Sequence, residues 1–236
     1  MRRWLLGVAA AGLAAAGAVA LVIWNQSGFH PDRLLAAYHA HAQVAGLQIA
    51  YPFNDTLFPP ESIPPTFRWR DTSGAAAGWL IAFEFADGRE PLFFSAAGTT
   101  WTAPAEVWET IKQRSRGGKA QAIILGLTTG WRTRMASAGA LAFSTSEDDV
   151  GAPIFYREVN LPFASAIKDP SHIRWRFGPI SSREPPPVVL EKLPVCGNCH
   201  SFSADGKVLG MGVDYGSDKG AYALLPVSRE MTLSRD

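Results

Sequence analysis

The sequence predicts a mainly β protein preceded by one transmembrane helix. Seventeen prolines and 22 glycines in 236 residues supply many turns, and the short segments between them alternate at strand period. Hydrophobic residues make up 47% of the chain and charged residues 18%, with eight Trp and thirteen Phe, which favours a folded core over disorder. The length is enough for one large domain or two small ones.

Residues 1–25 are predicted to form a membrane anchor. An uninterrupted apolar run extends from Trp4 to Trp24. At about 1.5 Å per residue it is long enough to cross a hydrocarbon core of about 30 Å. Arg2 and Arg3 precede the run, which places the N-terminus in the cytoplasm and the chain after it outside. A cleaved signal peptide with Ala18-Val19-Ala20 as its cleavage motif is the alternative, and in both cases the bulk of the protein is exported.

Residues 26–47 are predicted to form a juxtamembrane segment with one helix. Pro31 and Asp32 suit a first helical turn, and Gly46 suits a helix end. Between them, positions at helical spacing carry Leu34, Tyr38, His41 and Ala45. The sequence therefore predicts a helix over residues 31–45.

Residues 48–162 are predicted to form a β domain. Residues 66–70 alternate, with Phe67 and Trp69 on one side, and residues 79–85 and 92–94 flank the hairpin turn Asp87-Gly88. One amphipathic helix is predicted after Trp101, with Val107, Trp108 and Ile111 on its buried face, and it ends at Gly117-Gly118. Further strands are expected at 120–127, 140–144 and 153–159.

The segment Pro64-Pro65-Thr66-Phe67-Arg68-Trp69, followed by a strand that begins with Trp79, resembles fibronectin type III or immunoglobulin-like domains. The resemblance implies a two-sheet sandwich of the kind that serves as a spacer or binding module. We find no Gly-x-Ser-x-Gly elbow, no His-Glu-x-x-His helix and no glycine-rich phosphate loop in this region. The sequence therefore gives no reason to expect a catalyst here.

Residues 163–195 are predicted to be an extended, proline-rich connector, stiffened by Pro185-Pro186-Pro187. Within it, residues 172–177 alternate at strand period. One face of this strand carries His172, Arg174 and Arg176, and the other carries Ile173, Trp175 and Phe177.

The segment Cys196-Gly197-Asn198-Cys199-His200 holds both cysteines of the chain. It matches the C-x-x-C-H pattern of covalent haem attachment, and at these five positions the chain resembles c-type cytochromes. The resemblance implies one covalent haem c, held by thioethers from Cys196 and Cys199, with His200 as the axial ligand of the iron. It also implies a bacterial protein of the cytoplasmic membrane, with its C-terminal bulk in the periplasm or outside the cell.

The second iron ligand is left open by the sequence. Met211, His172, Met231 and an open position are the candidates, and Arg174 and Arg176 are candidates to pair with the haem propionates. For His172 a solvent-exposed position is the simpler interpretation, because a lone histidine is a weak ligand signal.

Three other interpretations of the cysteine pair are weaker. A strained disulfide is compatible with export, but a thioredoxin-like redox pair lacks the strand–helix setting that this chemistry uses. A zinc site would need further ligands at matching spacing, and the sequence has no second cluster.

Residues 196–236 combine the motif with a predicted hairpin. Ser203-Ala204-Asp205-Gly206-Lys207, a hydrophobic strand and Gly220-Ala221-Tyr222 resemble one hairpin of a TolB-like or WD-repeat β-propeller. A propeller has about 4 to 8 blades, and one repeat cannot bury its own apolar faces. We therefore expect the sequence to be the N-terminal part of a longer protein.

The leading functional hypothesis is a membrane-anchored, exported monohaem c-type protein for electron transfer or haem-based sensing. The alternative is a non-haem binding or scaffold protein of the cell envelope with a structural cysteine pair. Under either hypothesis the partner is an unknown redox or envelope protein. A net charge of +1 without a basic stretch argues against nucleic acid.

Overall fold

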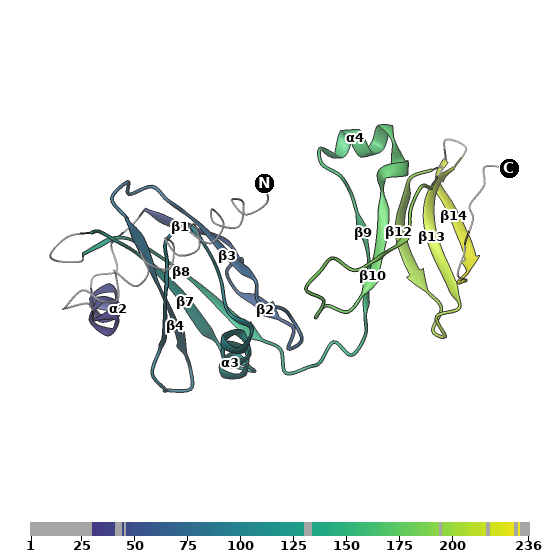
Figure 1. The fold of residues 1–236 in the computed structure, drawn as a ribbon. Helices are drawn as coiled ribbons and strands as arrows, with labels where there is room; N and C mark the ends of the chain where they lie inside the picture. The colour runs from purple at the N-terminus through teal and green to yellow at the C-terminus, as the bar shows by residue number, and fades with distance from the viewer. Residues whose placement is uncertain are drawn as a thin grey trace, which may run out of the picture. The chain divides into compact units, whose positions relative to one another are not determined.

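The computed structural model describes residues 30–40, 44, 46–129, 134–193, 195–215, 218–228 and 231. The protein is mainly β, with 45% strand and 16% helix, as the sequence predicts. It consists of two compact units that divide between Val150 and Gly151, and each has its own sheets (Figure 1). No helix among these residues has the length and apolarity needed to cross a membrane. The run from Trp4 to Trp24, on which the anchor prediction depends, lies outside them.

The first unit contains two helices and two sheets in its described residues. The elements are α2 (Pro31–Ala40), β1 (Leu47–Tyr51), β2 (Thr56–Phe58), β3 (Thr66–Asp71), β4 (Gly78–Phe85), β5 (Leu92–Ala96), β6 (Thr100–Thr102), α3 (Ala105–Ser115), β7 (Ala120–Leu127) and β8 (Met135–Thr145). One sheet has the order β1-β3-β6 and the other β2-β8-β7-β4-β5, in which β2 runs parallel to β8. The strands predicted around residues 66–70, 79–85, 92–94 and 120–127 are confirmed.

The core of the first unit lies between its two sheets. Phe67 and Trp69 of β3 face Phe83 of β4, and α3 adds Trp108 and Ile111; all five side chains are buried. Glycine follows this helix as predicted, because Gly117 adopts a positive φ of 65° that favours a residue without a side chain.

A second apolar cluster covers the other face of the larger sheet. Leu35 of α2 packs with Leu80, Ile123 and Leu125, so strand β7 is buried on both faces. Burial on both sides explains why residues 120–127 form a continuous apolar run and not an alternating one. The helix predicted over residues 31–45 is present from Pro31 to Ala40, and residues 41–43 and 45 lie outside the described part of the chain.

The second unit also has two sheets. Its elements are β9 (Ile154–Glu158), α4 (Phe163–Lys168), the short 3-10 helix η1 (Pro170–His172), β10 (Arg174–Gly178), β11 (Val188–Leu190), β12 (Gly197–Phe202), β13 (Val208–Tyr215) and β14 (Asp218–Pro226). The sheets have the orders β11-β10-β9 and β12-β13-β14, and all their pairings are antiparallel.

The two sheets of the second unit share one core. Trp175 of β10 and Leu190 of β11 pack with Leu209, Met211 and Val213 of β13, and all five are buried. The unit therefore holds the cysteine motif, in β12, against the tryptophan-bearing strand β10.

The boundary between the units differs from the sequence-based expectation. The sequence predicts that strand β9 closes the first domain, within residues 48–162. In the structure β9 instead pairs with β10 over five residue pairs. Residues 163–195, expected to be an extended connector, contain α4, η1, β10 and β11. Strand period identifies a strand but not its pairing partner, so the sequence could not show to which unit β9 belongs.

Candidate functional site

The cysteine motif lies at the edge of a sheet. Cys196 comes directly before β12, and Cys199 and His200 lie within this strand, which pairs with β13 on one side only. The register shifts between Gly197 and His200, and His200 lies opposite Met211. The motif is therefore held in an irregular strand next to the core.

The glycine of the motif is required by packing. A Cβ atom at Gly197 would lie 2.7 Å from the sulfur of Met211 and 2.8 Å from the ring of Trp175. Only a residue without a side chain allows the backbone of β12 to approach β10 and β13 this closely.

Arg157 of β9 holds the middle of the motif. Its Nη1 donates to the carbonyl oxygen of Gly197 at 2.7 Å and to Oδ1 of Asn198 at 2.7 Å. Together with Asn198, Cys199 and His200 it borders an open groove of about 430 Å³. The sequence interpretation missed Arg157. Arg157 and Phe155 are two residues apart in a predicted strand, so strand period could have placed both side chains on one face.

The imidazole of His200 has one engaged and one free ring nitrogen. Nε2 lies 3.3 Å from the carbonyl oxygen of Phe155, and the two rings meet edge to face with centroids 4.8 Å apart. Nδ1 is buried and has no hydrogen-bond partner among the described residues. His200 is therefore anchored through Nε2, with the tautomer assigned from the contacts, and its Nδ1 is a buried polar atom whose partner is not among the described residues.

The two thiols differ in their surroundings. Both are free; Cys196 is partly buried in the edge of the core, and Cys199 is exposed. Burial raises the pKa of the Cys196 thiol, and the nearby carboxylate of Asp214 raises it further, while Arg157 acts in the opposite direction. At neutral pH Cys196 is therefore held as a protonated thiol.

Met211 lies beside the motif but inside the core. Only 1% of its surface is exposed, and it packs in the same cluster as Trp175. As directly opposed residues of an antiparallel pair, Met211 and His200 point to the same face of the sheet. In the described part of the chain no three His, Cys, Asp or Glu side chains gather into a metal site.

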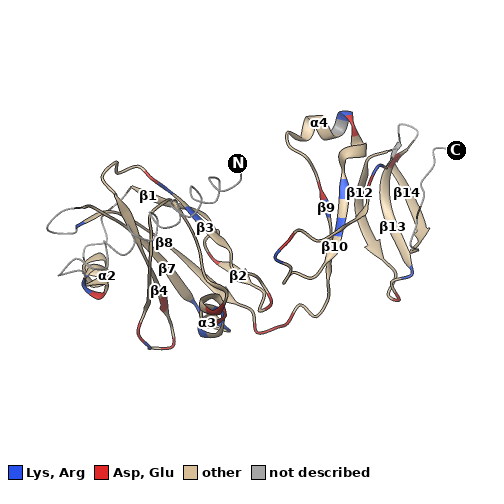
Figure 2. Cartoon of the chain, viewed as in Figure 1, with Lys and Arg blue, Asp and Glu red and all other residues tan. Residues whose placement is uncertain are grey.

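The structure does not bring Arg174 and Arg176 to the motif. Arg174 and Arg176 share one face of β10, as predicted. The opposite face of this sheet contacts β12, and it carries Trp175 of β10 together with Arg157 and Phe155 of the neighbouring strand β9. Both guanidinium groups instead bind Glu158 of β9: Arg174 Nε donates to Oε1 at 2.9 Å, and Arg176 donates to Oε2. Figure 2 shows these basic positions on β10 beside an acidic position on β9.

His172 is also away from the motif. The strand begins at Arg174, and His172 ends the 3-10 helix η1. Its side chain is 65% exposed, and its Nε2 lies 3.5 Å from a carboxylate oxygen of Asp169. The structure thus brings together Cys196, Cys199, His200 and Met211, and it separates them from His172, Arg174 and Arg176.

No protein-family model, curated protein or solved structure matches this chain. The site is therefore interpreted from its own residues.

The raised pKa of Cys196 predicts slow alkylation near neutral pH. In a Cys199→Ala chain made without haem, the rate of alkylation of Cys196 should rise with pH to a midpoint above about 8.5, the value of an ordinary thiol. Asp214→Asn should lower the midpoint, because the carboxylate that disfavours the thiolate is removed. Asp205→Asn, on the β12–β13 turn, is the matched control and should leave it unchanged; a midpoint at or below 8.5 would contradict the burial argument.

The pairing of Arg174 and Arg176 with Glu158 predicts a pH-dependent contribution to stability. The hydrogen bonds from Arg176, and next from Arg174, lower the pKa of Glu158. The stability that these bonds contribute is therefore complete above the unfolded-state pKa of about 4.3. It is lost as the pH falls through the lower pKa of the folded state. Arg176→Gln should lower the melting temperature at pH 7, by an amount that shrinks as the pH falls below about 4.

Thermal unfolding followed by circular dichroism measures this effect. Lys168→Gln replaces an exposed cation of the same unit and is the control. A melting-temperature difference that stays constant down to pH 2 would show that Arg176 stabilises the unit by packing and not through the ionised carboxylate.

Proposed function

We propose that this chain is an exported, membrane-anchored protein that carries one covalent haem c on Cys196, Cys199 and His200. The observation that carries the proposal is the pair of free thiols next to an imidazole with one ring nitrogen on a carbonyl and the other without a partner among the described residues. When bound, the haem would supply a one-electron couple or a binding position for a diatomic ligand.

The donor set fits a haem in its chemistry. Thioether formation needs two free thiols three positions apart, and iron ligation needs a neutral imidazole oriented by its other nitrogen. The carbonyl of Phe155 provides this orientation for His200. Cys199 and His200 both border the open groove, although the partnerless Nδ1 of His200 is buried.

The proposal requires a local change in β12. Successive side chains of a strand point to opposite faces, and the free nitrogen of His200 is buried. For one porphyrin to reach Cys199 and His200, the backbone must turn between them. The shifted register between Gly197 and His200 is the place in this strand where regular pairing is already interrupted.

Arg157 is the cation best placed to meet a haem propionate. It borders the groove, whereas Arg174 and Arg176 lie on the opposite face of their sheet and bind Glu158. A guanidinium group forms paired hydrogen bonds with carboxylates, so Arg157 could exchange its bond to Asn198 for one to a propionate.

Two candidates for the second iron ligand would need rearrangement to serve. Met211 points to the same face as His200 and is packed in the core, and His172 is exposed and paired with Asp169. Met231 packs against the same core cluster as Met211. Within this proposal the second ligand stays open between Met231 and an unfilled position, which would permit electron transfer or haem-based sensing.

The strand order of the first unit supports an immunoglobulin-like or fibronectin type III-like sandwich. In such folds strands A, B and E lie in one sheet and G, F and C in the other, with an added C′ strand in the variable type. The order β1-β3-β6 matches A-B-E, and within the order β2-β8-β7-β4-β5 the last four strands match G-F-C-C′, with β2 added parallel to β8 and α3 inserted between strands E and F. We propose that this unit is a spacer or binding module.

The β12–β14 sheet supports the comparison with one blade of a propeller. A blade has four antiparallel strands, and β12, β13 and β14 supply a three-stranded meander. The alternative function is a non-haem binding or scaffold protein of the cell envelope, in which Cys196 and Cys199 are a structural pair.

Haem attachment is tested by expressing the full chain in a bacterium that has the cytochrome c maturation machinery. The wild-type chain should keep peroxidase-active haem stain on a denaturing gel, and the double variant Cys196→Ala/Cys199→Ala should lose it because no thioether can then form. His172→Ala is the matched control and should keep the stain. Absence of stain in the wild-type chain contradicts the proposal, and stain retained by the double variant contradicts attachment through these two cysteines.

A further inference from the structure

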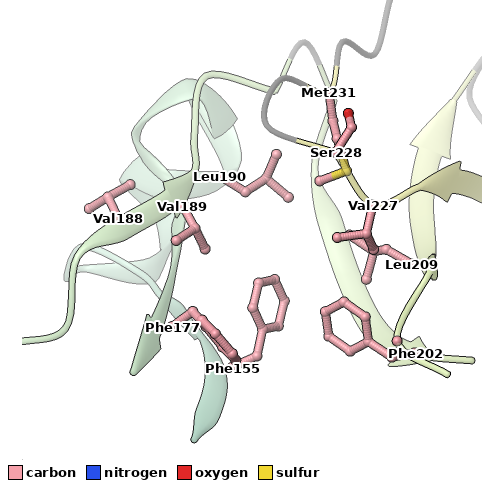
Figure 3. Close-up of a pocket in the computed structure, with 11 residues that line it drawn as sticks. Phe155, Phe177, Val188, Val189, Leu190, Phe202, Leu209, Val227, Ser228 and Met231 are labelled. Atoms are coloured by element: carbon pink, nitrogen blue, oxygen red, sulfur yellow. The ribbon is translucent and has the colours of Figure 1, made fainter. Parts of the chain in front are cut away.

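The second unit contains a cavity apart from the groove of the cysteine motif. It has a volume of about 640 Å³ and lies between the two sheets of the unit (Figure 3). Cavities of about 300 to 1,000 Å³ are typical of sites for small molecules. None of the proposed haem residues Cys196, Cys199 and His200 lines it.

The described walls of the cavity are mostly apolar and carry no charged side chain. In the described part of the chain the lining includes Phe155, Phe177, Val189, Phe202, Leu209 and Val227. No Asp, Glu, Lys, Arg or His side chain is among the described lining residues, and Ser228 supplies the one side-chain hydroxyl. A charged ligand would lose its hydration here without gaining a partner, so the chemistry of the walls selects an uncharged molecule.

Much of this apolar lining is open to solvent. Phe177 is 43% exposed, Val189 48%, Phe202 42% and Val227 44%. Single exposed hydrophobic residues are ordinary on a protein surface, but four of them around one concavity form a contiguous apolar site. In Figure 3 Phe155 and Leu190 from one sheet and Phe202 from the other point into the same space.

We propose that this cavity is a binding site for an uncharged, hydrocarbon-rich small molecule. The size of the cavity, the absence of charge on its described walls and the exposed aromatic and aliphatic side chains all point to this ligand class. The site is separate from the motif but shares one residue with its surroundings. Phe155 lines the cavity, and its ring also packs against His200, at 4.8 Å between centroids, and against Phe202, at 5.2 Å.

The proposal is tested by photolabelling the full chain in lipid nanodiscs with a long-chain alcohol that carries a diazirine. Peptide mapping should find label in segments 188–190 and 202–209, and an excess of unlabelled alcohol should remove it. Label is measured per mole of chain, so that samples can be compared directly. The test does not depend on haem, so it can be carried out whether or not the chain is stained on a gel.

Two substitutions at one wall residue separate cavity binding from general adsorption. Val189→Trp should fill the cavity, and Val189→Asp should place a charge in it. Each should lower labelling of these segments per mole of chain by about tenfold or more, which corresponds to about 1.4 kcal/mol in binding. The matched control is Val150→Trp, a half-exposed valine of the first unit, and it should leave the labelling unchanged.

Three results would overturn the proposal. The first is no label in segments 188–190 and 202–209. The second is equal label in both Val189 variants and the wild type. The third is stronger label on the exposed outer residues Tyr222 and Leu224 than in the cavity segments. Circular dichroism of each variant shows whether it is folded. Because two chemically different substitutions are used, failure of one to fold leaves the other as the test.

Discussion

The contact between Trp175 and the backbone at Gly197 is the constraint on which the second unit depends. Trp175 is fully buried, and the missing side chain of Gly197 lets β12 lie against its ring and against the sulfur of Met211. This contact joins the sheet of β9, β10 and β11 to the sheet of β12, β13 and β14. Because Gly197 lies between the two cysteines, the same contact fixes where the motif can be.

The surroundings of the motif follow from this packing. With β12 held against β10, Arg157 of β9 reaches the carbonyl of Gly197, and the carbonyl of Phe155 reaches the ring of His200. Both residues lie on the same face of β9, one strand from Trp175. Strand β9 thus supplies the guanidinium of Arg157 beside the groove and the carbonyl of Phe155 that orients the imidazole of His200. The ring of Phe155 lies between His200 and the apolar cavity.

The sequence predicted local structure well where one face of a strand is buried. Alternation in β3 and the Asp87-Gly88 turn were sufficient, because period and turn chemistry are local properties. The end of α3 was also predicted, from Gly117-Gly118, close to its position in the structure.

The features that depend on distant parts of the chain could not be predicted in this way. Nothing local shows that β9 pairs with β10, or that Glu158 takes both Arg174 and Arg176. The alternation of residues 172–177 correctly put the two arginines on one face, but only the packing of Trp175 shows that this face points away from the motif. The roles of Arg157 and Phe155 depend on the same pairing.

The central claim, a covalent haem on Cys196 and Cys199, is tested most directly by the intact mass of the chain. The protein is purified from a host with the cytochrome c maturation machinery, denatured, treated with an alkylating reagent and weighed by mass spectrometry. The account predicts a mass increased by one haem and no alkylated cysteine. An unincreased mass, with both thiols alkylated or joined in a disulfide, would contradict it.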